Sequence, residues 1–392
     1  MGQDITAATE RCRDYVIELR RYFRTWPELS TEEFKSQEKI MDELVKLGLE
    51  PRKIANTGVI ADIIGEFPGR TIAVRADMDA LALEDECGQL YQSKNPGVCH
   101  GCGHDGHMAM LLGIARVLCE VRSKIAGTVR LLFQPSEERY PGGALAMIAG
   151  GALEGVSAII AAHLWQPIPV GALGISYGRM MAQPGGFAIT IQGKGGHASM
   201  PHQAVDPIRV GMHISQAINS ISGCNMDPME PGVVAVTVFQ AGTVRNVIPD
   251  TAEIKGLIRV FDSELFTGIH KRIEQIAKGI CEAHGATYTF AGDISCPPVI
   301  NNPAIAQLVK EAGIQALGEA GVQEVIPVLG AEDFSQYQQK VPGALMFIGA
   351  GNPEKGIVYP HHHPKFDIDE ASLGHGVEIM VRTVMNYLSV LT

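Results

Sequence analysis

The order of apolar runs along the chain constrains the fold more than any other sequence feature. Short apolar runs at Thr128–Phe133 and Ala158–Ala162 alternate with helical patterns, which is typical of strands buried between layers of helices. Over residues 184–294 the order becomes β-α-β-β-α-β, which indicates a small ferredoxin-like sandwich. The alternation then resumes, with a strand near Ala344–Ile348. The sequence therefore predicts a layered α/β domain that is interrupted by an inserted domain.

A chain of 392 residues is longer than one hydrophobic core usually supports. We expect the α/β domain to comprise residues 1–183 and 295–392, because candidate site residues lie on both sides of the insert, and the inserted domain to comprise 184–294. The first domain should open with helices over Asp14–Arg24 and Glu32–Leu47, with Ser30 as the N-cap of the second.

Charge and composition exclude several classes of partner. The net charge of −11 is spread along the chain without a basic stripe, which argues against nucleic acid or an anionic membrane. No segment approaches the roughly 18 uninterrupted apolar residues of a membrane span, and the first residues lack a signal-type apolar run. Eight cysteines are too few for a disulfide scaffold. We therefore expect a cytosolic protein that acts on a small molecule.

Candidate metal ligands occur in three places. Cys102 and His104 offer a thiolate and an imidazole two positions apart, in a run whose glycines argue against a helix. His163 follows a buried apolar run, at a strand end where α/β proteins collect functional side chains, although a packed core histidine is the alternative. The triplet His361–His363 is a further candidate or simply a polar loop, and spacing alone does not say which histidine would bind. These ligands exceed what one zinc ion needs, so the hypothesis is a two-metal hydrolytic site.

The adjacent carboxylates Glu137 and Glu138 follow the strand over Thr128–Phe133. Because neighbouring side chains leave a strand in different directions, one can bind a metal while the other stays free to accept a proton from water. A hydrolase needs this division of roles. The alternative is a solvated acidic turn.

Asp77 and Asp79 follow the strand predicted over Thr71–Arg75, and their side chains lie on the same face. This spacing suits carboxylates that orient a histidine ligand, and Asp105 could do the same. An ion pair with Arg75 is the structural alternative.

Ordered motifs along nearly the whole chain carry a resemblance to a known family. They are Arg75-Ala-Asp-Met-Asp79, Cys102-Gly-His104-Asp-Gly-His107, Gln134-Pro-Ser-Glu137-Glu138, Gly193-Lys-Gly-Gly-His197, Asn246-Val-Ile-Pro249, Gly330-Ala-Glu-Asp-Phe334 and His361-His-His-Pro-Lys-Phe366. The chain resembles the metal-dependent amidohydrolases that include N-acyl-L-amino acid aminoacylases, hippurate hydrolase, N-acetyldiaminopimelate deacetylase and auxin–amino acid hydrolases. This resemblance implies an aminopeptidase-like catalytic domain.

The resemblance implies roles for individual residues. Two divalent ions, of zinc, manganese, cobalt or nickel, would be bound by Cys102, His104, Glu138, His163 and His362. His362 is chosen because the family's ligand stands two residues before the proline. Glu137 would be the general base, and Asp79 would orient a ligand.

The resemblance also implies that the insert serves as a lid and as the contact of a homodimer or homotetramer. His197 would polarise the substrate carbonyl, in its own subunit or in the neighbouring one, while Asn246 and Arg259 would hold the substrate. One stretch departs from the family pattern. Tyr22, Arg24 and Trp26 stand where relatives show histidines, and no ligand is expected there, so only the local surface or pocket rim should differ.

The predicted reaction is metal-dependent hydrolysis of N-acyl-L-amino acids to a carboxylic acid and a free amino acid. A carboxypeptidase or a ureide hydrolase would use the same site on another leaving group. A non-catalytic, metal-stabilised binding protein is the alternative from a different class, but it would have no need of Glu137. A third alternative is a hydrolase that uses Cys102 as nucleophile together with His104. The activity of such an enzyme would survive removal of the metal.

Overall fold

The computed structural model describes residues 2–389, which form two compact units. Unit 1 contains the residues up to Met180, Ile300–Pro327 and the residues from Asp333 onward, and unit 2 contains Met181–Val299 and Val328–Glu332. The segment Val328–Glu332 was predicted to belong to the first domain. It belongs to unit 2 because the backbone N–H of Ala182 donates to the carbonyls of Val328 and Gly330 over 3.1 and 2.9 Å.

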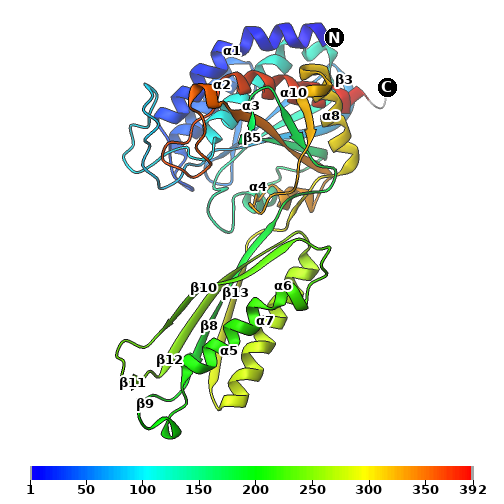
Figure 1. Ribbon diagram of the computed structural model, residues 1–392. Helices are drawn as coiled ribbons and strands as arrows, with labels where there is room; N and C mark the ends of the chain where they lie inside the picture. The colour runs from blue at the N-terminus through cyan, green and yellow to red at the C-terminus, as the bar shows by residue number, and fades with distance from the viewer. Residues whose placement is uncertain (1, 390–392) are drawn as a thin grey trace. The chain divides into compact units, whose positions relative to one another are not determined.

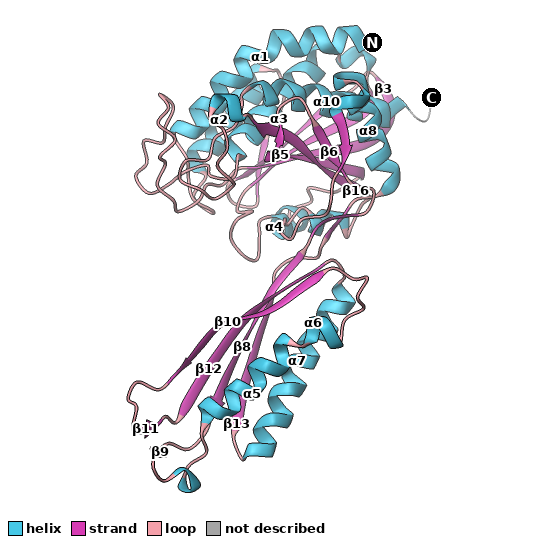
Figure 2. Cartoon of the chain, in the orientation of Figure 1, coloured by secondary structure: helices cyan, strands magenta, loops and turns pink. Residues whose placement is uncertain are grey.

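Unit 1 is built on one mixed sheet in the order β1-β2-β4-β3-β5-β16-β6-β15. The strands are β1 (Arg52–Ile54), β2 (Gly58–Ile64), β3 (Phe67–Asp77), β4 (Ala126–Gln134), β5 (Val156–Pro169), β6 (Leu173–Ile175), β15 (Val322–Glu324) and β16 (Gly343–Gly351). The helices are α1 (Gly2–Thr25), α2 (Phe34–Lys46), α3 (His104–Glu120), α4 (Ala144–Ala149), α8 (Pro303–Leu317), α9 (Ser335–Gln338) and α10 (Ala371–Ser389). The predicted α/β class is confirmed, and Figure 1 and Figure 2 show the helices α1, α3 and α10 along one side of this sheet.

Apolar periodicity explains this packing. Every residue of β16 is buried, as expected for a strand covered on both faces. Helix α1 packs against α3 and α10 through a stripe of residues spaced three or four apart. The buried apolar members of this stripe are Ile5, Ala8, Cys12, Val16, Leu19 and Phe23.

Neighbouring parallel strands bring the candidate site residues to one edge of the sheet. Strands β4, β3 and β5 run parallel side by side, and β3 ends at Asp77 while β4 ends at Gln134. Strand β5 is longer than predicted and runs on to Pro169. Its pairing with β3 stops at the pair Arg75–Ala161, and His163 follows two residues later, level with Asp77 at the end of β3. This carboxyl edge is where α/β proteins place their functional side chains.

Unit 2 has the β-α-β-β-α-β order that the sequence predicts. Its sheet has the order β10-β12-β8-β13, and helices α5 and α7 pack on it (Figure 2). The elements are β8 (Gln183–Gln192), β9 (Gly196–His197), α5 (Pro207–Asn219), α6 (Ile221–Cys224), β10 (Gly232–Ala241), β11 (Val247–Ile248), β12 (Thr251–Val260), α7 (Ser263–His284) and β13 (Thr287–Ile294), while β7 (Arg179–Met181) and β14 (Val299–Ile300) lie at the unit boundary. Over residues 2–389, no helix has both the length and the apolar character needed to cross a membrane.

Candidate metal centre

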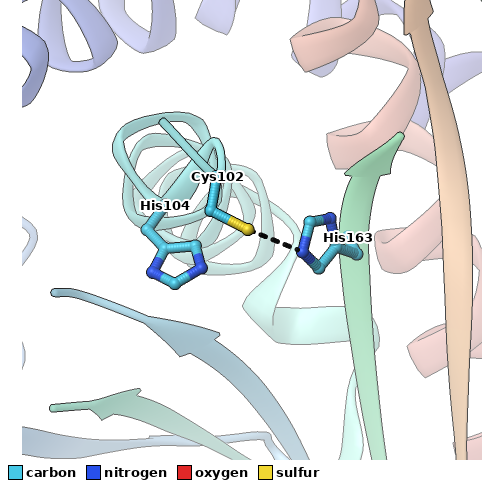
Figure 3. Close-up of side chains that lie close together, drawn as sticks. All are labelled: Cys102, His104 and His163. Carbon is cyan, nitrogen blue, oxygen red and sulfur yellow. Dashed lines mark hydrogen bonds between the residues drawn. The ribbon is translucent and has the colours of Figure 1, made fainter. Parts of the chain in front are cut away.

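Three candidate ligands meet at the carboxyl edge of the unit 1 sheet. Cys102, His104 and His163 each offer a ligand atom within 4.8 Å of the other two. Figure 3 shows them, with Cys102 Sγ 3.5 Å from His163 Nε2. All three side chains are buried. Residues that the chain separates by about sixty positions are thus brought to one point, as predicted.

His104 is the first residue of α3, so the helix, expected from about His107, begins three residues earlier, within the run that was predicted to be non-helical. Gly103 precedes it with a φ of 91°, a left-handed conformation that glycine adopts without strain. His104 Nδ1 lies 2.9 Å from the backbone carbonyl of Asp79. Because a carbonyl only accepts, Nδ1 carries a hydrogen and Nε2 is the atom left for a metal. Burial lowers the pKa of His104, but the charge of Asp77 and the contact with Asp79 outweigh burial and raise this pKa to about 10, so a cation at Nε2 would take the place of a proton. Nε2 is buried and has no hydrogen-bond partner among the described residues.

His163 is held in the same way. Its Nδ1 donates to the carbonyl of Leu164 over 2.9 Å, which leaves Nε2 as the atom that faces Cys102. Burial, together with the neighbouring histidines, holds the pKa of His163 well below its usual value, so the ring is neutral. Burial raises the pKa of the Cys102 thiol, as does the charge of Glu138. A thiolate at this position therefore requires a cation beside it.

His362 and Glu138 extend the cluster. His362 Nε2 lies 3.2 Å from Glu138 Oε1, and both residues lie within 4.8 Å of Cys102 by their ligand atoms. His362 has a φ of 62°, which is unusual for a residue with a side chain.

The structure distinguishes between the three histidines of the triplet. His361 Nε2 donates to the carbonyl of Leu164 over 2.9 Å, and its ring packs against Trp165. His363 Nδ1 accepts a hydrogen bond from the backbone N–H of Lys365 over 3.0 Å. His362 is the member of the triplet whose ligand atom lies in a group with those of Cys102 and Glu138, which is the choice that the resemblance implies.

Asp79 fixes the turn that carries the two glutamates. Its Oδ1 accepts the backbone N–H of Glu137 and its Oδ2 that of Glu138, each over 3.0 Å. Ser30 Oγ donates to Oδ2 over 2.6 Å. Burial opposes the charge on Asp79, but hydrogen bonds from His104 and Ser30 hold its pKa below the usual value.

Ser30 is therefore a site residue that the sequence did not reveal. The prediction that it caps the second helix is wrong, because α2 begins at Phe34 and Glu33 occupies the N-cap.

Glu137 and Glu138 both have a carboxylate oxygen within 4.8 Å of a ring nitrogen of His104. Each is only partly exposed. The turn therefore presents two carboxylates to the histidine cluster, as predicted, and Glu138 also contacts His362.

Asp77 lies beside the candidate ligand His104, with its Oδ2 3.7 Å from His104 Nε2, and both Asp77 and Asp105 also form ion pairs with arginines. Asp77 accepts from His107 Nδ1 over 2.6 Å and from Arg75 over 2.7 Å, so the ion pair with Arg75 is present. His107 Nε2 accepts the backbone N–H of Leu164 over 2.8 Å, which leaves neither ring nitrogen free for a metal. Asp105 pairs with Arg20 over 2.8 Å.

The donor set fits divalent first-row metals. Thiolates, imidazoles and carboxylates are the ligand types that such ions take, and the members exceed the four of a tetrahedral zinc site. Buried polar atoms normally have a partner, so the free Nε2 of His104 also points to a cation ligand.

The candidate residues of unit 2 form two groups. His197 lies in β9, which pairs with β11, and the backbone N–H of Ala198 donates to the carbonyl of Asn246 over 3.1 Å. His197 Nδ1 accepts the backbone N–H of Ser199 over 3.1 Å, so the neutral ring carries its hydrogen on Nε2, and the residue is exposed. The ribbon of β9 and β11 stands at one end of the sheet in Figure 1.

Arg259 is at the other end of that sheet, where it pairs with Pro184 of β8 and donates to the carbonyl of Ile258 over 3.0 Å. Strand β12 separates Asn246 from Arg259 by roughly 25 Å at about 3.3 Å per residue. The two expected substrate-binding residues are not brought together within unit 2.

The chain matches peptidase family M20/M25/M40 over residues 73–386. It is 45% identical over 300 residues to an N-acyl-L-amino acid amidohydrolase of Geobacillus stearothermophilus, covering 76% of this chain and 81% of the relative. It is 40% identical over 368 residues to thermostable carboxypeptidase 1 of Saccharolobus solfataricus, covering 93% of both chains.

Among solved structures, the chain superimposes on the YXEP protein of Bacillus subtilis, a dinuclear metal-binding peptidase of the M20 family, with a TM-score of 0.84. The sequence identity is 33%, and the match covers 97% of this chain and all of the other. The resemblance seen in the motifs is thereby confirmed. The chain belongs to peptidase family M20/M25/M40 and is a hydrolytic enzyme of that family.

Proposed function

We propose that this chain hydrolyses the amide bond of N-acyl-L-amino acids at a centre of two divalent metal ions, releasing a carboxylic acid and a free amino acid. The observation that carries the proposal is that candidate ligand atoms form groups in which all atoms lie within 4.8 Å of one another. One of these groups includes Glu137. The name of the Geobacillus stearothermophilus relative supports this substrate class. We expect the enzyme to act in the cytosol.

Cys102, His104, Glu138, His163 and His362 would hold the ions. Zinc, manganese, cobalt and nickel all suit this mixture of nitrogen, sulfur and oxygen ligands. When bound, such ions lower the pKa of water and polarise a carbonyl group.

Glu137 would act as the general base. Its backbone is fixed by Asp79, while its side chain stays partly exposed beside His104. It would accept a proton from water as the water oxygen attacks the amide carbon. It would then donate that proton to the amine nitrogen as the C–N bond breaks, so Glu137 ends the reaction in the charge state in which it began.

His197 would stabilise the negative charge that develops on the substrate oxygen, because its Nε2–H is a hydrogen-bond donor. We propose that His197 and Asn246 serve the site of a second copy in a homodimer. Within unit 2 they lie at the end of the sheet remote from Gln183, where the chain enters the unit. Arg259 lies at the other end of β12 and would bind the substrate carboxylate.

A chelation and reconstitution assay tests the proposal. The enzyme is stripped with chelator, reloaded with each candidate metal and assayed on N-acetyl amino acids, dipeptides and N-carbamoyl amino acids. We expect activity to disappear and return with metal, and the N-acetyl amino acids to give the highest kcat/KM. A higher value on dipeptides would favour a carboxypeptidase, as in the Saccharolobus solfataricus relative. Full activity after metal removal would contradict the proposal.

A further inference from the structure

We propose that Arg24 is a positioning residue of the metal centre, whose buried guanidinium holds the loops of Cys102 and His362 in the arrangement that metal binding requires. The inference rests on the ligand assignment proposed above. It gives a role to a residue at which this chain departs from the family's histidine pattern.

Arg24 lies near the end of α1 and is fully buried. Its Nε and Nη2 bind the two oxygens of Asp85 over 2.8 and 3.0 Å. Its Nη1 donates to the carbonyl of His100 over 2.7 Å, and its Nη2 donates to the carbonyl of Phe366 over 2.9 Å. One side chain therefore ties together two loops that are far apart in the sequence.

Both loops carry proposed ligands. His100 stands two residues before Cys102, and Phe366 stands four residues after His362. The loops also contact each other directly, because the backbone N–H of His362 donates to the carbonyl of Gly101 over 2.8 Å. Arg24 thus binds each loop close to this junction.

The backbone of His362 needs such support. Its φ of 62° is costly for a residue with a side chain and persists only where the surrounding contacts impose it. The hydrogen bond from Arg24 to Phe366 fixes the loop on one side of His362, and the bond to Gly101 fixes His362 itself.

Further contacts support Arg24 and Asp85. Arg20, one turn earlier in α1, binds Asp105 over 2.8 Å next to His104, and it also contacts Asp367. Asp85 additionally accepts the backbone N–H groups of Cys87 and Ser93, each over 3.1 Å. The side chains of Arg24 and Asp85 are therefore held by α1 on one side and by the loop before Cys102 on the other.

Arginine is required because its planar fork reaches a carboxylate and two carbonyls at once. Lysine keeps the charge but is a point donor without this geometry. Arg24→Lys should therefore retain the ion pair with Asp85 but lose the hydrogen bond to the carbonyl of His100, of Phe366 or of both.

A purely structural role would lower stability without changing metal affinity, and two control variants separate the roles. Arg130 has the same chemistry away from the site, since it binds both oxygens of Asp62 over 2.8 Å and the carbonyl of Glu154 over 2.8 Å. Arg130→Lys tests the loss of such a network. Val16→Ala weakens the packing of α1 without touching the loops.

The experiment titrates metal-free enzyme with zinc or manganese and measures Kd, alongside Tm of the metal-free form. For Arg24→Lys we expect metal affinity to fall about 10- to 100-fold, as for the loss of other groups that support ligands. The two controls should lower Tm and keep the parental Kd. A parental Kd in Arg24→Lys, or an equal loss of affinity in Arg130→Lys, would overturn the inference.

If Arg24→Lys does not fold, the double variant Arg24→Met with Asp85→Asn carries the same test, because it removes both buried charges together. Cys102→Ser is measured in parallel. If its metal affinity is unchanged, the ligand assignment fails, whereas a loss in Cys102→Ser with none in Arg24→Lys refutes only the inference about Arg24.

Discussion

The backbone N–H of Glu138 donates a hydrogen bond to Oδ2 of Asp79 over 3.0 Å. The other oxygen of Asp79 accepts the N–H of Glu137 over the same distance. One carboxylate thereby sets the direction of two consecutive residues, one proposed as a ligand and one as the base.

Asp79→Asn should disturb this turn. An amide has one acceptor oxygen, so its NH₂ group would face a backbone N–H donor that has lost its partner. We expect kcat to fall about 10- to 100-fold, as is typical when a group that orients metal ligands is lost, with the fold retained in circular dichroism. Asp62→Asn, away from the site, is the control. Parental kcat in Asp79→Asn would show that the turn does not depend on this carboxylate.

Cys102→Ser should weaken metal retention, since a serine hydroxyl is a poorer ligand for these ions than a thiolate. Elemental analysis after dialysis measures this, and we expect less than the parental metal content. Cys99→Ser is a matched control, because Cys99 is buried in the same run but belongs to none of the ligand groups. Unchanged stoichiometry in Cys102→Ser would remove the thiol from the ligand set.

The proposal that His197 serves a second subunit predicts complementation. His197→Ala and Glu137→Gln should each be nearly inactive alone. In co-expressed hybrids of a two-fold dimer, one site combines an intact Glu137 with an intact His197 of the partner, so about a quarter of all sites should recover. Activity is measured on the purified mixture against separately expressed variants. An absence of recovery in a confirmed hybrid would place His197 in its own subunit's site.

The titration of His375 should contribute to the pH dependence of the free energy of unfolding. Burial lowers the pKa of this α10 histidine, against the charges of Glu378 and Asp369. The unfolded chain therefore binds a proton at a higher pH than the folded protein, and the free energy of unfolding falls as pH drops through about 6.5, until the folded histidine is protonated as well. His375→Gln should flatten this decline in urea unfolding at pH 8 and pH 5.5. An equally steep decline in the variant would assign it to other groups.

The sequence predicted those parts of the fold that depend on local pattern. The apolar run Ala158–Ala162 lies within β5, and the β-α-β-β-α-β order of unit 2 is as expected, since both follow from periodicity. The contacts of Ser30 with Asp79 and of Arg24 with Phe366 join residues far apart in the chain, which no local spacing reveals.

The length of β12 explains why Asn246 and Arg259 are far apart in unit 2. They are close in sequence, but Asn246 stands before the start of β12 and Arg259 near its end. The choice among the three histidines of the triplet likewise needed the contacts of His361 and His363, which spacing could not supply.

The most direct test of the account is to measure metal content and turnover on the same preparation of Glu137→Gln. We predict that the variant keeps the two metal ions of the parental enzyme, because Glu138 and not Glu137 is the proposed ligand. Its turnover of an N-acetyl amino acid should fall by about 10²- to 10⁴-fold, the contribution of a general base. Hydrolysis near the parental rate with the metals retained would contradict the proposed role of Glu137.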